Sequence, residues 1–541
     1  MKQQSTMKSQ KTLGCLAAFG LVAASARAAL IPVTEDIAPG AVVTWTADNT
    51  YRLDTIIYVH DGAVLNIQPG TVIYGAQDVT IGRDDIPNLV SALWVTRGGR
   101  LNAVGTAEQP IIFTVEGDDL QGGVGPDETG LWGGVVLLGR ARLNSAKDAE
   151  GNAASPIYEV YEGVDGPGPN GEHVFGGDDD ADSSGRLRYV SIRHAGNEFA
   201  PASELNGLTL GAVGSGTELS YVEVFAGSDD GFEWWGGTVN GDHLVAAFIE
   251  DDDFDTDQGY TGRNQFLLGI KPPWAGTADS RGFETDGDLN QSAEGEEPIS
   301  KWYGYNATMI GRGKEETSGS LGVAWNVRDE TAPNVFNSIF AAWDKGLKLD
   351  PDGLYHFQTP PPSARIANNV WDVTTGATST DGEFIFTTAA FLNTIQDAML
   401  GGISYAADLG LDPRPQAGSP AFENVVAGAP APVNYRGAFS GPNDNWADGW
   451  TALSQLGYLK PATPGLTTPV ILDFAVAGQT AMVTVQSVAG MSYQLEAKSP
   501  TTGSWADAGN AMSGDGNPIV LEAPAAQDHE FFRVRGFVTA P

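Results

Sequence analysis

The sequence predicts an all-β protein, in which a long parallel β-solenoid is followed by a small β-sandwich. Three observations lead to this fold class. Short runs of apolar and β-branched residues alternate with turns rich in glycine, asparagine and aspartate, and the chain contains 69 glycines. A three-residue pattern returns along the middle of the chain at steps of 24, 22 and 29 residues. A segment rich in proline and threonine, 459–470, then ends this pattern.

The N-terminus is typical of a secretory signal peptide, which we assign to residues 1–28. Basic residues open the chain, the apolar stretch 13–24 follows, and Ala26-Arg27-Ala28 matches a cleavage signal. The only cysteine, Cys15, lies in this segment, so the mature chain has neither a disulfide nor a thiolate nucleophile. We expect a product that is secreted, either free outside the cell or at the cell surface.

The chain of 541 residues is strongly acidic, with 30 Lys and Arg against 68 Asp and Glu and a formal net charge of −38. This balance argues against a nucleic-acid partner, because phosphate binding requires basic patches. No later stretch is apolar and long enough to predict a membrane span. Metal cations and neutral or basic polymers are the expected partners, and the acidity also favours solubility.

The solenoid domain is expected over residues 29–460. Its repeated pattern is a small residue, an apolar residue and often an acid. The pattern occurs at Gly207-Leu208-Thr209, Gly231-Phe232-Glu233, Asp253-Phe254-Asp255, Gly282-Phe283-Glu284 and Gly346-Leu347-Lys348. If each repeat is one coil, its central residue points inward, and successive coils lie about 4.8 Å apart. The long gap before Gly346 has room for two or three coils. A β-sandwich array is the alternative fold, but the tight hairpin turns that it needs are scarce.

Two further segments complete the expected organisation. Residues 461–470 form a linker, and residues 471–541 contain at least four alternating strands that suggest a small β-sandwich. Within the solenoid, only 387–400 has the apolar spacing of a helix.

The main body resembles the right-handed parallel β-helix proteins of the pectin-lyase-like superfamily, and within it a group of bacterial exported proteins. The resemblance is carried by GGRLNAVGTAEQPIIFT (98–114), GLWGGVVLLGRARLN (130–144), the acid-rich stretch 205–262 and RGFETDGD (281–288). It implies the fold and supplies no catalytic residues. The tail, with MSYQLEAKSPTTGSWADAG (491–509) and FFRVRG (531–536), resembles accessory β-sandwich modules of secreted proteins from verrucomicrobial-type bacteria.

The stretch EDDDFDTDQGY, 250–260, is the most unusual feature of the solenoid. Aligned on the repeats, Glu233, Asp255 and Glu284 form an outward ladder of acids, and Asp230 aligns with Asp252. Stacked carboxylates repel, and Ca²⁺ is the ion that such oxygen ligands bind readily. The candidate metal ligands are Asp229, Asp230, Glu233, Asp252, Asp253, Asp255, Asp257, Glu284 and Asp286. A solvated acidic face and a catalytic carboxylate cluster remain the alternatives.

For catalysis, the resemblance implies either two carboxylates, as in hydrolases of this fold, or Ca²⁺ with a basic residue, as in its lyases. The candidates are Asp230, Asp252, Asp255, Arg263 and Arg281. The Gly-His-Gly and Arg-x-Lys patterns of those hydrolases are missing. Trp234 and Trp235 are candidate ligand-binding residues, because sugars stack on exposed aromatic rings.

Three functions stay open on the sequence. The first is a protein that binds Ca²⁺ and an extracellular polysaccharide or cell-surface glycan through this acidic, aromatic flank. The second is a polysaccharide lyase or glycoside hydrolase that uses the candidate residues. The third is a structural component of the cell surface or matrix.

Overall fold

The structure is a computed structural model of the whole chain. It describes residues 29–84, 86–144, 157–164, 166–200, 203–274, 280–287, 297–315, 322–461, 470–477, 480–487, 491–498, 506–514, 517–524 and 531–538. The expected signal peptide, 1–28, and most of the expected linker, 461–470, lie outside these residues. Among the helices of the described ranges, none is long and apolar enough to cross a membrane.

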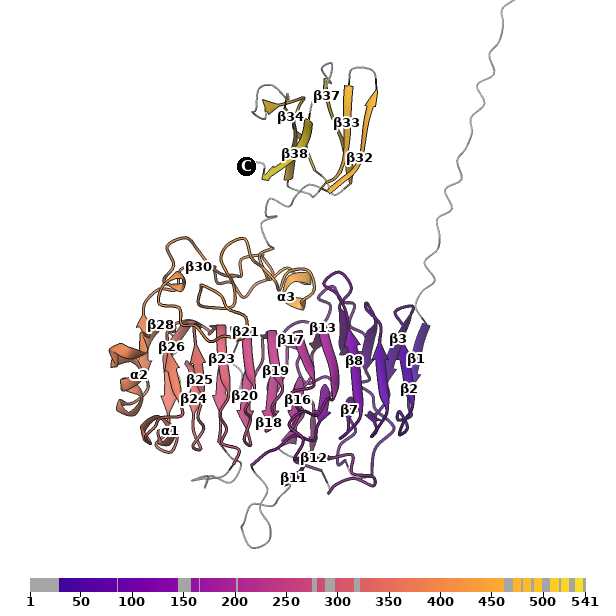
Figure 1. Cartoon of the computed structure of the whole chain (residues 1–541). Helices are drawn as coiled ribbons and strands as arrows, with labels where there is room; N and C mark the ends of the chain where they lie inside the picture. Colours follow the sequence, from indigo (N-terminus) through magenta and orange to yellow (C-terminus); the bar gives the residue numbers. More distant parts are fainter. Residues whose placement is uncertain are drawn as a thin grey trace, which may run out of the picture.

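The main body is a parallel β-helix whose coils follow one another in chain order, so that strands of successive coils lie side by side (Figure 1). The parallel pairings define three faces. Face 1 holds β4 (Ile56–Val59), β7 (Ala92–Val95), β10 (Val135–Leu138), β16 (Leu208–Gly211), β18 (Phe232–Trp235), β20 (Phe254–Asp257), β22 (Phe283–Thr285) and β24 (Val323–Val327). This face carries the acidic ladder.

The other two faces begin as separate strands and then merge. Face 2 begins with β2 (Val42–Trp45), β5 (Val64–Ile67) and β8 (Arg100–Val104). Face 3 begins with β1 (Ala29–Val33), β3 (Asn49–Leu53), β6 (Val72–Gly75) and β9 (Ile111–Val115). Long strands then supply both faces: β13 (Gly185–Arg193), β17 (Glu218–Phe225), β19 (Asn240–Ala247), β21 (Arg263–Ile270) and β23 (Tyr303–Ile310). The last coils hold β25 (Asn334–Phe336), β26 (Ile339–Leu349), β27 (Arg365–Ala367), β28 (Val370–Ala377) and β29 (Thr394–Ile395).

Each long strand turns a corner at a residue that has a positive φ and is skipped in the strand pairing. These corner residues are Tyr189, Tyr221, His243, Phe266 and Asn306. The ring of His243 is stacked on that of Tyr221, with centroids 4.3 Å apart, and packs against that of Phe266 at 4.7 Å. The corner therefore forms a ladder of its own, on a different part of each coil from the acids.

The predicted inward ladder is confirmed. Leu208 pairs with Phe232, Phe232 with Phe254, and Phe254 with Phe283, and all four are buried. Phe283 then pairs with Trp325, and Trp325 with Leu347, so the long gap holds two coils. Each apolar side chain packs on its equivalents, which makes one continuous core.

Two hairpins and several short helices interrupt the coils. The hairpins are β11 (Ile157–Val160) with β12 (Val174–Gly177), and β14 (Glu198–Ala200) with β15 (Ser203–Glu204). The helices are α1 (Tyr355–Gln358), α2 (Glu383–Thr387) and α3 (Ala452–Gln455), with 3-10 turns at Thr380–Gly382, Ala389–Phe391 and Pro420–Phe422. The helix expected over 387–400 is wrong: Leu392 has a φ of 54°, and Thr394–Ile395 continue face 3 as β29.

Residues 396–460 return along the solenoid after the last coil, with β30 (Leu400–Gly402) and β31 (Asp412–Pro415) paired within them. Their side chains, including those of Phe439 and Trp450, pack on the outer residues of face 3. Corner asparagines hold this segment, since Asn306 Nδ2 donates to Tyr435 O at 2.8 Å and Asn337 Nδ2 to Val426 O at 2.8 Å.

The C-terminal residues form two small antiparallel sheets, consistent with the expected sandwich. One contains β32 (Val470–Ala477), β33 (Thr480–Gln486) and β37 (Pro518–Pro524). The other contains β34 (Met491–Lys498), β35 (Ala506–Asp507), β36 (Met512–Ser513) and β38 (Phe531–Val538). Val483 and Tyr493, one from each sheet, belong to a common apolar core.

Candidate metal-binding carboxylate cluster

The acidic ladder lies on face 1 in the register that the repeats predict. Glu233 in β18 pairs with Asp255 in β20, and Asp255 pairs with Glu284 in β22. The column begins with Thr209 and continues beyond Glu284 to Asn326. Because rungs of a parallel sheet lie about 4.8 Å apart, equivalent side chains on this face are direct neighbours.

A second column runs through the turns that lead into these strands. Asp230 precedes β18 as Asp252 precedes β20, and Asp252 N donates to Asp230 Oδ1 at 2.9 Å. The next equivalent residue is Arg281, whose N donates to Asp252 Oδ1 at 2.6 Å. Each turn therefore hydrogen-bonds to the carboxylate of the preceding turn, which fixes the side chains of Asp230 and Asp252.

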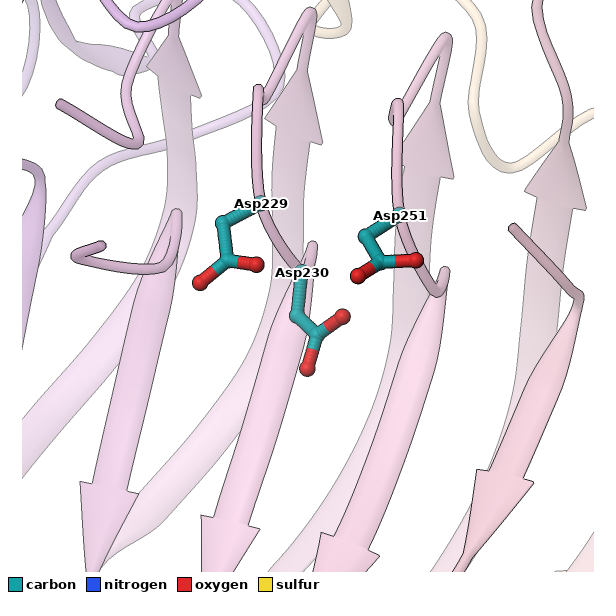
Figure 2. Close-up of side chains that lie close together, drawn as sticks. All are labelled: Asp229, Asp230 and Asp251. Carbon is teal, nitrogen blue, oxygen red and sulfur yellow. The ribbon is translucent and has the colours of Figure 1, made fainter. Parts of the chain in front are cut away.

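Two groups of three acids can place ligand atoms within 4.8 Å of one another, and they share Asp230. One group is Asp230, Glu233 and Asp255. The other is Asp229, Asp230 and Asp251; Figure 2 shows Asp229 and Asp230 on one turn and Asp251 on the neighbouring one. Asp251 is not among the predicted ligands. Both groups have the all-oxygen donor set that hard cations such as Ca²⁺ prefer.

Two more acids approach from the hairpins. Glu162, which follows β11, and Glu204 in β15 both raise the pKa of Asp229 by their charge. Nothing in the repeat pattern points to Glu162 or Glu204, because both belong to insertions that have no equivalent on other coils. Chain topology alone brings them to the cluster.

Burial raises the pKa values of the four acids Asp229, Asp230, Glu233 and Asp255. The pKa of Asp229 is raised to about 8, first by burial and then by the charges of Asp251, Glu204 and Glu162. Burial and neighbouring carboxylates also hold the pKa values of Asp230, Glu233 and Asp255 well above their usual range. Burial and mutual repulsion therefore favour the protonated forms of these groups, and a bound cation would oppose that shift.

Asp255 is the least compensated member. Asp255 is only 8% exposed, and its buried Oδ1 has no hydrogen-bond partner in the described residues. Glu233, by contrast, accepts a hydrogen bond at 2.6 Å from Asn206 Nδ2 and another from the side chain of Trp235. A buried carboxylate oxygen without a donor is unfavourable, and the Asp255 carboxylate also lies within 4.8 Å of carboxylate oxygens of Asp230 and Glu233.

The far end of the cluster is compensated by arginine. Arg281 Nη1 lies 2.9 Å from Glu284 Oε1. Arg328 donates from Nε and Nη2 to the two oxygens of Asp286, each at 2.7 Å. Burial still raises the pKa of Asp286, with Arg328 opposing the shift. Arg328 was missed by the sequence analysis, since it lies after β24, one coil beyond Asp286.

The cluster thus has two parts. We call Asp229, Asp230, Glu233 and Asp255 the cation-free half, because the described residues provide no ion pair to any of them. We call Asp252, Glu284, Asp286, Arg281 and Arg328 the arginine-paired half. Asp257 lies between the two parts, 8% exposed, with Oδ1 accepting from Gln258 N.

Asp253 was expected to face outward as a metal ligand, and this prediction is wrong. The residue is 0% exposed and points into the coil, where its Oδ1 lies 3.0 Å from Lys271 Nζ. Gly269 makes the room, since a Cβ there would clash with Asp253 Oδ2. Burial raises the pKa of Asp253 to about 7, with Lys271 opposing the shift. This pair is a structural element of the core.

The two tryptophans are also not a sugar-stacking surface in this structure. Trp234 is 0% exposed and belongs to the inner core, stacked near Phe232. Trp235 does face outward from β18, but the β11–β12 hairpin covers it. Its ring centroid lies 4.6 Å from that of Tyr161 and 5.6 Å from that of Phe175.

The candidate catalytic residues are not all brought together. Asp230, Asp252 and Asp255 are neighbours in the cluster, as predicted. Arg281 is there too, but it is 2% exposed and paired with Glu284, so it is not available as a base. Arg263 opens β21 on face 2, with its guanidinium 4.6 Å from the ring centroid of Tyr303.

Comparison with known families agrees with this architecture. The profile of the pectate-lyase-like β-helix domain matches residues 37–398. The chain belongs to this family. The matched region contains every rung of the carboxylate cluster and ends just beyond the last coil. A comparison with curated proteins gives no match.

Proposed function

We propose that the cation-free half binds a divalent cation, Ca²⁺, and that the bound ion helps a secreted β-helix to hold an extracellular polysaccharide. The observation that carries the proposal is the buried Asp255 carboxylate: its Oδ1 has no donor in the described residues, and the group lies within 4.8 Å of carboxylate oxygens of Asp230 and Glu233. A hard cation would satisfy that oxygen and remove the repulsion. Pectate-lyase-like folds suggest polysaccharide ligands, which supports the second part.

The positions of the acids suggest which of them would bind the ion directly and which would add further oxygens. Asp230, Glu233 and Asp255 would be the first ligands, and Asp229 with Asp251 would add oxygens on the side of the hairpins. Water or sugar hydroxyl and carboxylate groups would fill the remaining positions, because Ca²⁺ takes six to eight ligands. Asn206, already bonded to Glu233, would orient that carboxylate.

The test is a polysaccharide-binding assay with mature protein, carried out with Ca²⁺ and again with a chelator. We expect at least one acidic polysaccharide to retain the parent only in the presence of Ca²⁺, and the Asp255→Asn variant to lose this retention. Release of unsaturated or reducing ends would identify turnover and favour an enzyme. If no polysaccharide retains the parent with Ca²⁺ present, the glycan part of the proposal fails, whatever the metal does.

A further inference from the structure

Arg263 is an exposed cation for which the described part of the chain offers no carboxylate partner. It belongs to an outward column on face 2 that contains Arg186, Glu218, Asn240, Arg263 and Tyr303. In the first two rungs, Arg186 Nε lies 2.6 Å from Glu218 Oε2. At Arg263, the preceding rung presents Asn240 instead of an acid.

The guanidinium of Arg263 lies over the ring of Tyr303, at 4.6 Å from the centroid, as in a cation–π contact. The backbone of Arg263 is bonded to the preceding rung, because Arg263 N donates to Asn240 Oδ1 at 2.9 Å. This bond uses the amide oxygen of Asn240, and the NH₂ group of the same side chain is a hydrogen-bond donor.

Asn240, Asp242 and Arg263 line a cavity of about 390 Å³ between the corner ladder and the returning segment. His243 and Phe266 form one wall. Asp242 Oδ1 accepts from His243 Nδ1, because a carboxylate can only accept, so Nδ1 carries the proton. His243 Nε2 is then left without a partner in the described residues, and the side chain is 19% exposed.

The opposite wall is Pro430 and Ala431, and it is fixed to the solenoid. Gln265 Nε2 donates to Ala431 O at 2.8 Å, and Ala431 N donates to Gln265 Oε1 at 2.8 Å. This reciprocal pair holds the segment at one position on face 2. The cavity is therefore largely formed before any ligand arrives, with an apolar lining and a few fixed polar groups, as is usual for small-ligand sites.

We propose that this cavity binds a small carboxylate that carries a ring. The carboxylate would pair with Arg263 and Asn240, since a guanidinium fork matches the two oxygens of a carboxylate. The ring would lie against Phe266 and Pro430. The site uses no residue of the carboxylate cluster, so it is independent of the Ca²⁺ proposal.

The test is calorimetric titration of mature protein with benzoate and D-glucuronate, beside their neutral counterparts benzamide and D-glucose. We expect at least one of the two acids to bind and its neutral counterpart not to bind. Arg263→Gln should weaken that binding about ten- to hundredfold, as for loss of a charged hydrogen bond. Asn240→Glu should do the same, because it supplies Arg263 with the carboxylate that Glu218 supplies to Arg186.

Two controls make the result specific. Arg186→Gln removes an arginine of the same column that is already paired, and it should leave binding unchanged. Asp255→Asn should also leave binding unchanged. Binding of neither acid, equal binding of the neutral counterparts, or full binding by both Arg263→Gln and Asn240→Glu would overturn the proposal.

Discussion

The two halves of the carboxylate cluster lie on neighbouring rungs of face 1 but differ in what opposes their negative charge. In the arginine-paired half, Glu284 and Asp286 each meet a guanidinium at less than 3 Å. In the cation-free half, Asp230, Glu233 and Asp255 meet one another. Both sets are largely buried, so the difference lies in what opposes the charge and not in exposure. Buried charges require compensation, and among the described residues only the arginine-paired half contains ion pairs.

The largest expected effect is a loss of stability when an arginine of the arginine-paired half is removed. Arg281→Met would remove the cation that lies near Asp252 and the nearer of the two arginines at Glu284, and breaking a buried pair typically costs about 3–5 kcal/mol. Denaturant unfolding should show this loss of stability. Arg186→Met, which breaks the exposed pair with Glu218, is the matched control and should cost at most about 1 kcal/mol. Equal losses in both variants would mean that burial of the pair is irrelevant.

In the cation-free half, we expect a substitution to raise the stability of the protein instead of lowering it. Asp255→Asn removes a charge that four neighbouring acids repel, and its new amide N–H groups can donate to Asp230 and Glu233. With Ca²⁺ removed by a chelator, we expect the variant to be about 1–3 kcal/mol more stable than the parent. If the variant is less stable than the parent in the presence of the chelator, the Asp255 carboxylate already has a compensating partner.

A smaller effect is expected on the pH dependence of stability. Since the folded-state pKa of Asp229 is about 8, against an ordinary value near 4, the folded chain binds more protons than the unfolded chain between these values. The contribution of Asp229 to stability therefore falls as pH rises through this window, and the full contribution is present only below the ordinary pKa. Unfolding at pH 5, 6, 7 and 8 with a chelator should show this decline, and Asp229→Asn should flatten it. Saturating Ca²⁺ should flatten it as well.

Much of the ladder could be predicted from the sequence because rung spacing converts directly into contacts. Once Phe232, Phe254 and Phe283 are aligned as inward residues, the positions of Glu233, Asp255 and Glu284 follow from the period-two alternation. Alternation failed at Asp253, which occupies the column of small residues represented by Gly231 and Gly282. A carboxylate fits inward there because Gly269, in the next strand of the coil, makes room, and Lys271, just after that strand, supplies a cation.

Contacts that depend on insertions could not be predicted. The β11–β12 hairpin buries Trp235 under Tyr161, and it brings Glu162 to the cluster, yet the hairpin belongs to no repeat. The same applies to residues 396–460, whose return along the solenoid creates the cavity at Arg263. Local patterns specify the rungs of a solenoid, whereas the coverage of its outer faces depends on chain segments far away in sequence.

The most direct test of the difference between the halves is a calcium titration by calorimetry. It compares the parent with Asp255→Asn and with Glu284→Gln, which neutralises the next acid of the same column in the arginine-paired half. The cation-free half predicts saturable binding by the parent, with release of protons near neutral pH because the raised pKa values fall when the ion binds. Binding should be lost in Asp255→Asn and kept in Glu284→Gln. No binding by the parent, or the same binding by the parent and Asp255→Asn, would contradict the account.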